Sequence, residues 1–393
     1  MSADVIVVGA GIVGAACAAE LAGRGLSVDV FDGYGIGGGA TSAGMGHLVV
    51  MNDSPAEFSL SRLSRALWLE LAPHLRARDA FSRCGTLWVA EDDEELAAAR
   101  AMRDDFAAGG IRASMVDQAA LRALEPALSH AMQGGLLIED DAIVYAPCAA
   151  QWLLTRSPGA ARIRVSVNRA VVSVDGALVT LKDGERRHAA HVVIANGLAA
   201  RELIDGLPLE PKKGHLLITD RYPRALHHQV LELGYIKSAH HARGTSVAFN
   251  AQPRPTGQVL IGSSRQFGTL DPAVEWNVLS AMLKRAMRYL PDLRDLSAIR
   301  SWTGFRAATP DGLPLIGPAR HPDDGMWLAA GHEGLGVTTS LGTAMLLADV
   351  MLGSTSATLP FPLPDAAAFE PSRFTTRDAI GSSANIVRDA ASL

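Results

Sequence analysis

The first twenty residues constrain the fold more than any other part of the chain. The run Val5–Val8 is apolar without polar alternation, which is typical of a strand buried on both faces of a parallel sheet. Glycines at G-x-G-x-x-G spacing follow and lead into an alanine-rich segment of good helix propensity. This order predicts a strand, a tight turn and a helix whose N-terminus faces a pyrophosphate. We expect that group to be held by Gly9, Ala10, Gly11, Ile12, Val13 and Gly14.

A second strand supports this interpretation, because residues 27–31 have β-type character and Asp32 follows them. In dinucleotide-binding proteins, an acidic residue about 20 positions after the motif bonds a ribose hydroxyl. The alternative is an ordinary loop that contains glycine. The strand before the motif and the acid after it favour dinucleotide binding, but they do not choose between FAD and NAD.

The segment after Asp32 is rich in glycine, which occupies seven of the fourteen positions 33–46. Such a segment forms either a flexible loop or a backbone moulded against a flat, bulky ligand. Its place directly after the ribose-binding strand favours the second interpretation. We expect Thr41 and Ser42 to offer hydroxyl groups to phosphate.

Length and composition set the broad class. The 393 residues suffice for two domains, and the net charge of −5 gives no indication of a nucleic-acid surface. The cysteines, Cys17, Cys84 and Cys148, form no C-x-x-C pair, so we expect neither a metal nor an iron–sulfur site, and they suit a reducing compartment. We see no signal peptide and no apolar stretch long enough to span a membrane, so we expect a cytoplasmic location.

The remaining sequence alternates between helical and β-type patterns. Helices are predicted over 57–78, 92–108, 117–124, 147–155, 273–290 and, after the glycine-rich segment 331–338, as far as Leu352. Strands are predicted over 85–90, 134–138, 163–174, 177–182, 191–197 and 326–330. Short β-type runs between 207 and 268 predict a meander in a separate antiparallel sheet.

Two finer expectations concern side chains. On helix 273–290 we expect Trp276, Leu279, Leu283 and Met287 to share one face. The adjacent pairs His227–His228 and His240–His241 argue against a metal site, because neighbours on a strand point to opposite faces.

Five motifs, taken in order, resemble one known family. They are the opening glycine motif with Asp32, the loop 39–42, the strand 192–197, the segment 305–317 and the glycine-rich helix start 331–336. Together they resemble the FAD-dependent amino-acid oxidases and dehydrogenases, which include glycine oxidase and D-amino-acid oxidase. The resemblance implies non-covalent FAD and an α/β fold, with a Rossmann-like parallel sheet and an α+β substrate domain whose sheet is mainly antiparallel. It also implies discontinuous domains: 1–83, 141–205 and 301–370 for FAD, 84–140 and 206–300 for substrate, and a tail at 371–393.

The resemblance also implies a site. Arg306 would bind the substrate carboxylate, for which a planar guanidinium is well suited; the alternative is a surface salt bridge. Tyr235 would close the pocket or be a half-buried sheet tyrosine, and His47, Arg265 and His332 are further candidates. Besides the opening motif, Asp32 and an adenine-facing Val171, the expected cofactor contacts are Gly39, Ala40, Thr41, Ser42, Gly44, Met45, Gly46, His47, Ala195, Asn196, Gly197, Gly304, Arg306, Gly331, Glu333, Gly334, Leu335, Gly336, Val337 and Thr338.

Segments 44–51, 84–90, 211–216 and 262–267 look more specifically like the FAD subunit of D-hydroxyproline dehydrogenases and related hetero-oligomeric opine and cyanide-forming dehydrogenases. This resemblance implies oxidation of the C–N bond of D-hydroxyproline to an imine, by hydride transfer to flavin N5. It implies other dehydrogenase subunits or another electron acceptor as partners, and a peripheral membrane location through them. Some relatives carry FMN at a subunit interface, which this sequence does not place.

Several alternatives stay open at this point. The chain could be a glycine, sarcosine or opine oxidase or dehydrogenase of the same family, or a non-catalytic flavin subunit that relays electrons. An NAD-dependent dehydrogenase is the remaining rival, and a yellow protein with flavin absorbance would exclude it.

Overall fold

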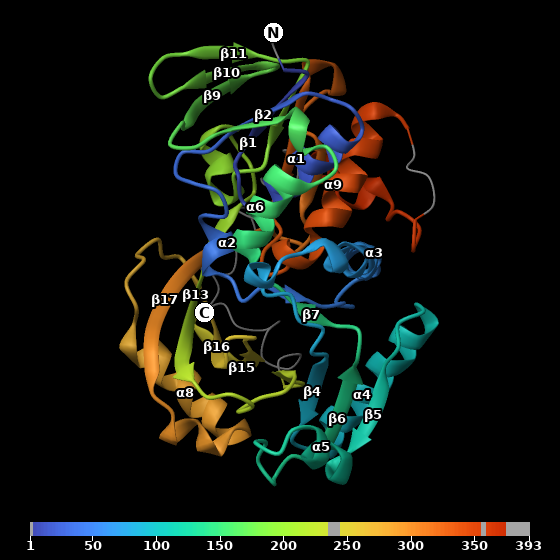
Figure 1. Cartoon of the computed structure of the whole chain (residues 1–393), viewed down its shortest axis with the longest axis vertical. Helices are drawn as coiled ribbons and strands as arrows, with labels where there is room; N and C mark the ends of the chain where they lie inside the picture. Colours follow the sequence, from blue (N-terminus) through green and yellow to red (C-terminus); the bar gives the residue numbers. More distant parts are fainter. Residues whose placement is uncertain (1–2, 235–243, 355–358, 375–393) are drawn as a thin grey trace, which may run out of the picture.

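Two large sheets organise the part of the chain that the structure, a computed structural model, describes: residues 3–234, 244–354 and 359–374. In Figure 1 a six-stranded sheet occupies the upper half and an eight-stranded sheet the lower half. The expected α/β fold with a second, mainly antiparallel sheet is confirmed.

The six-stranded sheet contains the opening strand near its centre. Its order is β18 (Leu315–Pro318), β19 (Met326–Ala330), β12 (His191–Ile194), β1 (Val5–Val8), β2 (Val28–Phe31) and β8 (Ile163–Ser166). All neighbours are parallel except the edge strand β18, which runs antiparallel to β19. The carboxyl ends of β1, β2 and β12 therefore meet at one edge, where parallel sheets bind ligands.

Strand β1 is apolar throughout because both faces of the sheet are covered. Val5 and Val7 pack in the core on the helical side, whereas Ile6 and Val8 pack with Val179 on the other. That second layer is a three-stranded sheet of β11 (Arg186–His188), β10 (Leu178–Leu181) and β9 (Val171–Asp175).

The helical layer joins both ends of the chain. Helix α1 (Ile12–Gly23) packs against α9 (Gly336–Leu352) and α6 (Ala146–Arg156), and α9 also packs against α3 (Pro55–Leu71). Short α2 (Ala40–Ala43) lies within the glycine-rich segment 33–46, and the pair β3 (His47–Leu48) and β7 (Ala142–Ile143) lies between the halves. Two glycine-rich helix starts thus come together from opposite ends of the sequence.

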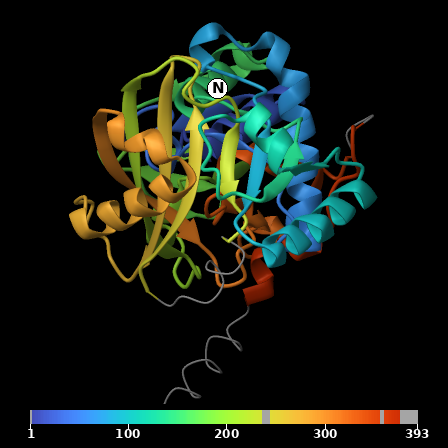
Figure 2. The same cartoon turned by 90° about the horizontal axis from the view of Figure 1, so that it is seen from below.

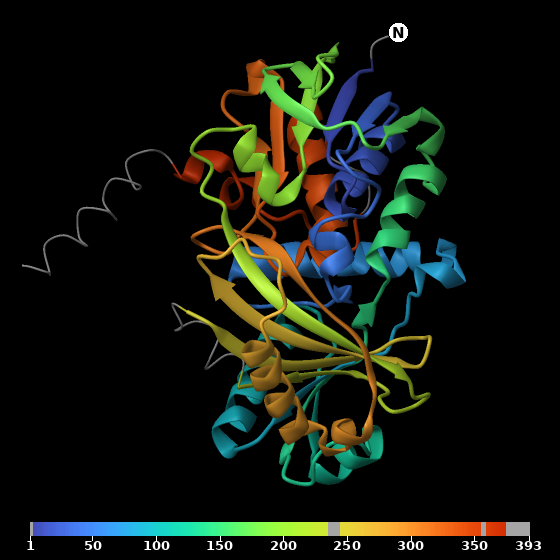
Figure 3. The same ribbon diagram turned by 90° about the vertical axis from the view of Figure 1, so that its left-hand side faces the viewer.

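The eight-stranded sheet carries the second layer. Its order is β17 (Ala298–Ala308), β13 (Glu210–Arg221), β16 (Gln258–Phe267), β15 (Ser246–Pro253), β14 (Gln229–Glu232), β4 (Thr86–Ala90), β6 (Gly134–Ile138) and β5 (Ser114–Asp117). Only β14 and β4 pair in parallel among these strands. Its helices are α4 (Asp93–Ala108), α5 (Gln118–Leu124) and α8 (Trp276–Tyr289), and Figure 2 shows α8 lying across strands β15 and β16. In Figure 3 the long strands β13 and β17 run from beneath the upper half down to α8.

Several predicted elements need correction. The segment 163–174 is two strands in different sheets, because the chain turns between β8 and β9, with Asn168 at φ +57°. The helix expected to reach residue 78 ends at Leu71 and continues as short 3-10 turns. The run 207–268 is no simple meander, since β13 pairs with β16 and β17 rather than with β14.

The expected face of α8 is also wrong. Trp276 is 72% exposed and Met287 is exposed, whereas Leu279 is buried as expected. The buried face consists of Val278, Leu279, Met282, Ala286 and Tyr289. We propose the domain division given above, with one refinement: β17 crosses the boundary at residue 301 as part of the eight-stranded sheet.

Candidate active site

The glycine motif forms a turn in which two glycines are required by close contact. Gly9 has φ +108°, and a Cβ there would lie 2.7 Å from the carbonyl oxygen of Ala195, just after β12. A Cβ on Gly14 would lie 2.1 Å from the carbonyl oxygen of Gly9. Gly14 therefore lets α1 pack directly on the end of β1, and Gly9 lets the end of β12 lie alongside.

Two side chains fix this turn from the segments that follow it. The carboxylate of Asp32 accepts the backbone N–H groups of Ala10 and Tyr34, each at 2.8 Å. The hydroxyl oxygen of Thr41 accepts the backbone N–H of Ile12 at 3.0 Å. Thr41 thus caps the start of α1, where we expected its hydroxyl to meet phosphate.

A continuous cavity of about 2120 Å³ runs from this turn to strands β13, β16 and β17. It exceeds the roughly 300–1,000 Å³ typical of a pocket for one drug-sized ligand. Most expected cofactor residues line it, together with Arg265 and His332: Gly9, Gly11, Ile12, Val13, Asp32, Gly39, Ala40, Thr41, Ser42, Gly44, Met45, Gly46, His47, Val171, Ala195, Asn196, Gly197, Gly304, Arg306, Gly331, Glu333, Gly334, Leu335, Gly336 and Val337. The cavity thus brings together residues from both glycine-rich helix starts.

Other expected site residues have different places. Ala10, Gly14 and Thr338 do not line the cavity. The N–H of Ala10 faces Asp32, Gly14 packs on β1, and the hydroxyl of Thr338 donates to the carbonyl of His47 at 2.9 Å. Tyr235 lies outside the described residues.

Arg306 lies on β17, in register with Lys212 on β13. Its guanidinium lies over Gly214, where an added Cβ would be 3.0 Å from Nη2, so a side chain at this position would push the guanidinium away from the strand. Nη1 donates to the carbonyl oxygen of Ser264 on β16 at 3.2 Å. Because a guanidinium has five N–H donors, this fixed side chain can also bind a planar anion in the cavity.

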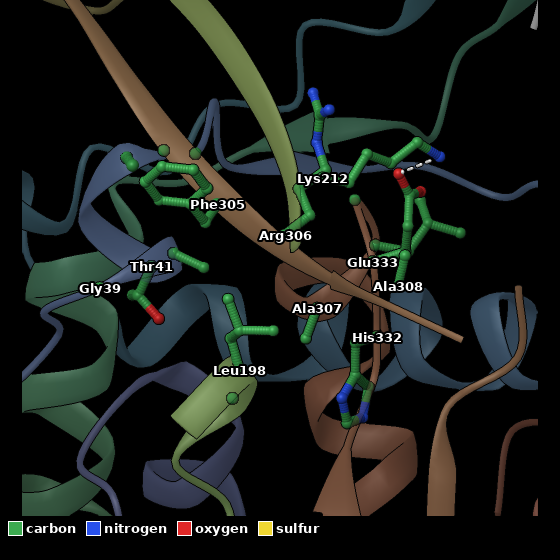
Figure 4. A pocket seen from close by; sticks show the side chains of 18 of the residues that line it. Gly39, Thr41, Leu198, Lys212, Phe305, Arg306, Ala307, Ala308, His332 and Glu333 are labelled. Carbon is green, nitrogen blue, oxygen red and sulfur yellow. Dashed lines mark ion pairs between the residues drawn. The ribbon is translucent and has the colours of Figure 1, made fainter. Parts of the chain in front are cut away.

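Charged groups surround Arg306. Nζ of Lys212 lies 2.8 Å from Oε1 of Glu333. Figure 4 marks this ion pair with a dashed line. Burial alone would raise the pKa of Glu333, but the charges of Arg306, Lys212 and Arg265 outweigh it and lower that pKa to about 2. Burial lowers the pKa of Lys212. Three cationic side chains thus lie near the carboxylate of Glu333, with Asp53 also acting on Arg265, and the remaining excess of positive charge attracts an anion.

The two histidine candidates are neutral groups in this arrangement. Burial lowers the pKa of His47, whose Nδ1 donates to Oε1 of Gln229. Burial also lowers the pKa of His332 to about 3, and its Nε2 lies 3.0 Å from the hydroxyl of Thr343 in α9. Figure 4 shows the ring of His332 directed away from the Lys212–Glu333 pair, so it supports the helix start.

Sequence reasoning gave Lys212 no role of its own, although its segment contributed to the resemblance. The signal was the alternation along β13. Lys212, Gly214 and Leu216 line the cavity, whereas Lys213 is fully buried on the opposite face and pairs with Glu275 at 2.9 Å.

Two acidic residues after β3 were also missed. Asp53 and Glu57 line the cavity, and Oε1 of Glu57 is buried with no hydrogen-bond partner among the described residues. Burial, with smaller contributions from the charges of Asp53 and Glu333, raises the pKa of Glu57 to about 7. No sequence pattern distinguishes Glu57 from an ordinary acid in the first turn of a helix.

The family is decided by comparison with known proteins. The family described as FAD dependent oxidoreductase matches residues 4–350. The chain belongs to this family. Hydrogen cyanide synthase subunit HcnC of Pseudomonas aeruginosa is 28% identical over 402 residues, covering 88% of this chain and 91% of that protein. Glycine oxidase of Geobacillus kaustophilus is 30% identical over 366 residues, covering 88% and 92%. The crystal structure of glycine oxidase from Geobacillus kaustophilus gives a TM-score of 0.81 at 28% identity, covering 95% of this chain and 99% of that one.

Membership of the family makes FAD, rather than NAD, the dinucleotide to expect. The residues fit it: the turn at Gly9 admits no Cβ, and Oδ1 of Asn196 beside it is buried with no hydrogen-bond partner among the described residues. The comparisons give no support for FMN. Within the described ranges, no helix is both long and apolar enough to cross a membrane.

Proposed function

We propose that this chain is an FAD-dependent dehydrogenase that oxidises the C–N bond of a small amino or imino acid. The observation that carries the proposal is the guanidinium of Arg306, seated on Gly214 in the cavity that also reaches the pyrophosphate turn. FAD, when bound by the residues at that turn, supplies the acceptor for the hydride. The chain is 30% identical to a glycine oxidase, whose name gives an amino acid as the substrate, and this supports the proposed substrate class.

The protein's own contribution is binding and orientation. Arg306 binds the substrate carboxylate through its planar fork, which fixes the Cα–H and the nitrogen in one orientation. The substrate nitrogen must be neutral to share its electron pair as the hydride leaves, so the rate should rise with pH as the ammonium loses its proton. We assign no residue as its base.

As the specific substrate we propose cis-4-hydroxy-D-proline, which would yield the hydroxylated pyrroline carboxylate by losing a hydride and the N–H proton. The resemblance of the segments 44–51 and 262–267 to D-hydroxyproline dehydrogenases supports this choice. Glycine or sarcosine is the second candidate, favoured by the similarity to glycine oxidase.

We also propose that the electrons leave through a partner subunit or another acceptor rather than directly to oxygen. HcnC is named as a subunit, which supports an assembly for this chain as well. The three dispersed cysteines of this chain cannot ligate a four-cysteine cluster by themselves.

The test uses the purified chain with FAD under anaerobic conditions. Addition of cis-4-hydroxy-D-proline should bleach the flavin absorbance, and glycine or sarcosine should do so more slowly. Bleaching by glycine alone would select the second candidate, and no bleaching by any amino or imino acid would contradict the proposed function. Peroxide formation in air as fast as reduction of an artificial acceptor would show an oxidase.

A further inference from the structure

The Lys212–Glu333 ion pair faces the cavity next to the proposed carboxylate site. Lys212 is the register partner of Arg306 across β13 and β17, and both members of the pair line the cavity. Their side chains are 13% and 21% exposed, so the pair is largely but not fully enclosed. The oxidation proposed above makes no use of it.

Both ends of the pair are held in place. Glu333 has φ +46°, in the left-handed region that favours glycine, and its backbone N–H donates to the carbonyl of Ala307 at 3.0 Å. Nonglycine residues in this region often lie at functional sites. Nζ of Lys212 lies 5.2 Å from the centre of the Phe267 ring, in cation–π contact. The backbone of Glu333 and the ammonium group of Lys212 are therefore each held by contacts outside the pair.

An enclosed ion pair presents a hydrogen-bond donor beside an acceptor. A hydroxyl group is both donor and acceptor, so it can accept from Lys212 and donate to Glu333 at once. A second carboxylate only accepts and would be repelled by Glu333, and a methylene group satisfies neither partner. We propose that Lys212 and Glu333 recognise a hydroxyl group on the substrate and so favour hydroxylated amino or imino acids. This rests on the proposed function and names the residues that select its substrate.

The expected selectivity is moderate. A site whose polar groups are left without partners rejects the analogue lacking a hydroxyl by factors of about 10⁴–10⁵. Lys212 and Glu333 bond each other when the hydroxyl is absent, at 2.8 Å. We therefore expect a preference of about 10- to 100-fold in kcat/KM.

The experiment compares substrates that differ by one hydroxyl: cis-4-hydroxy-D-proline with D-proline, and D-serine with D-alanine. In Lys212→Met and Glu333→Gln holoenzymes of equal FAD content, the ratio of kcat/KM within a pair should fall about tenfold or more, beyond any loss that both members of the pair share. Lys212→Arg, which keeps a donor, should retain most of the ratio. Lys284→Met, at an exposed position on α8, is the matched control and should leave it unchanged.

Equal losses for the hydroxylated and the plain substrate would overturn the inference, because they would show that the pair only maintains the cavity. If the wild type oxidises none of the four compounds, the proposed function fails. Dissociation constants for the same pairs, from shifts in flavin absorbance, then test the inference separately. It stands if the wild type binds the hydroxylated member more tightly and the variants do not, and it falls if the wild type shows no difference.

Discussion

The cavity is lined by backbone atoms at one end and by side chains at the other. At the nucleotide end the backbone makes the surface, and the decisive contacts are those that a Cβ at Gly9 or Gly14 would prevent. At the substrate end side chains make the surface, from strands β13, β16 and β17 and from the loop before α9. Arg306, Lys212 and Glu333 meet there although they are distant in the chain.

Because of this difference, the two ends of the cavity should respond differently to substitution. A turn in which an added Cβ would lie 2–3 Å from backbone atoms has no room for a methyl group, so substitution there disturbs both the fold and cofactor binding. A surface of charged side chains tolerates changes in side-chain shape. Substrate binding there depends on the balance of charges and on where each charged group points. Substitutions at the two ends should therefore separate FAD retention from catalysis.

The largest effect should come from Gly14→Ala. The new Cβ would lie 2.1 Å from the carbonyl oxygen of Gly9, a backbone atom that cannot move without displacing β1 from α1. We expect a loss of about 3 kcal/mol or more of folding stability and a protein largely free of FAD. The flavin-to-protein absorbance ratio and the melting temperature measure both.

The matched control is Gly23→Ala in the same helix, where an added Cβ has nothing within 4 Å. This change should keep FAD and leave stability equal or slightly higher, since alanine favours a helix by up to about 1 kcal/mol over glycine. A Gly14→Ala protein with full FAD content would contradict the contact argument.

The next effect concerns Arg306→Ala at the other end. Loss of a bidentate, charge-assisted contact should lower kcat/KM by about 10³-fold, or roughly 4 kcal/mol, with FAD content and melting temperature nearly unchanged. Arg306→Lys should recover only part of the activity, because an ammonium lacks the planar fork. Undiminished activity in Arg306→Ala would remove this residue from the site.

The same contrast explains what the sequence could predict. Local patterns gave β1, the turn after it and α4, which begins one residue inside the predicted range 92–108 and ends with it. The hairpin between β9 and β10 is also local, because Asp175–Gly176 is a common hairpin turn and Gly176 has the φ of +54° that such a turn requires. In each of these places the structure is decided within a few positions of the chain.

The predictions that failed, and the residues that were missed, concern features decided by contacts between distant segments of the chain. The face that α8 buries is set by the sheet it covers, so the spacing of Trp276 and Met287 was not enough. The role of Lys212 depends on the register of β13 on β17, which brings it beside Arg306. Arg306 itself was predicted from a family motif, whereas the contact of its guanidinium with Gly214 was not.

The smallest effect should come from Glu57, which lies near the charges of the substrate end. Its folded pKa of about 7 is above the value of about 4.3 for a free glutamate, so folding favours the protonated form. Stability is therefore lost as pH rises from about 4.3 to 7, by roughly 1–2 kcal/mol once partial exposure is allowed for. Glu57→Gln should be more stable than the wild type by that amount at pH 8 and nearly equal to it at pH 4, as measured by urea unfolding.

Asp53→Asn, which removes a neighbouring like charge, should reduce the stability that the protein loses between pH 4 and pH 8 without abolishing that loss. An identical difference between Glu57→Gln and wild type at both pH values would show that packing, not charge, distinguishes them.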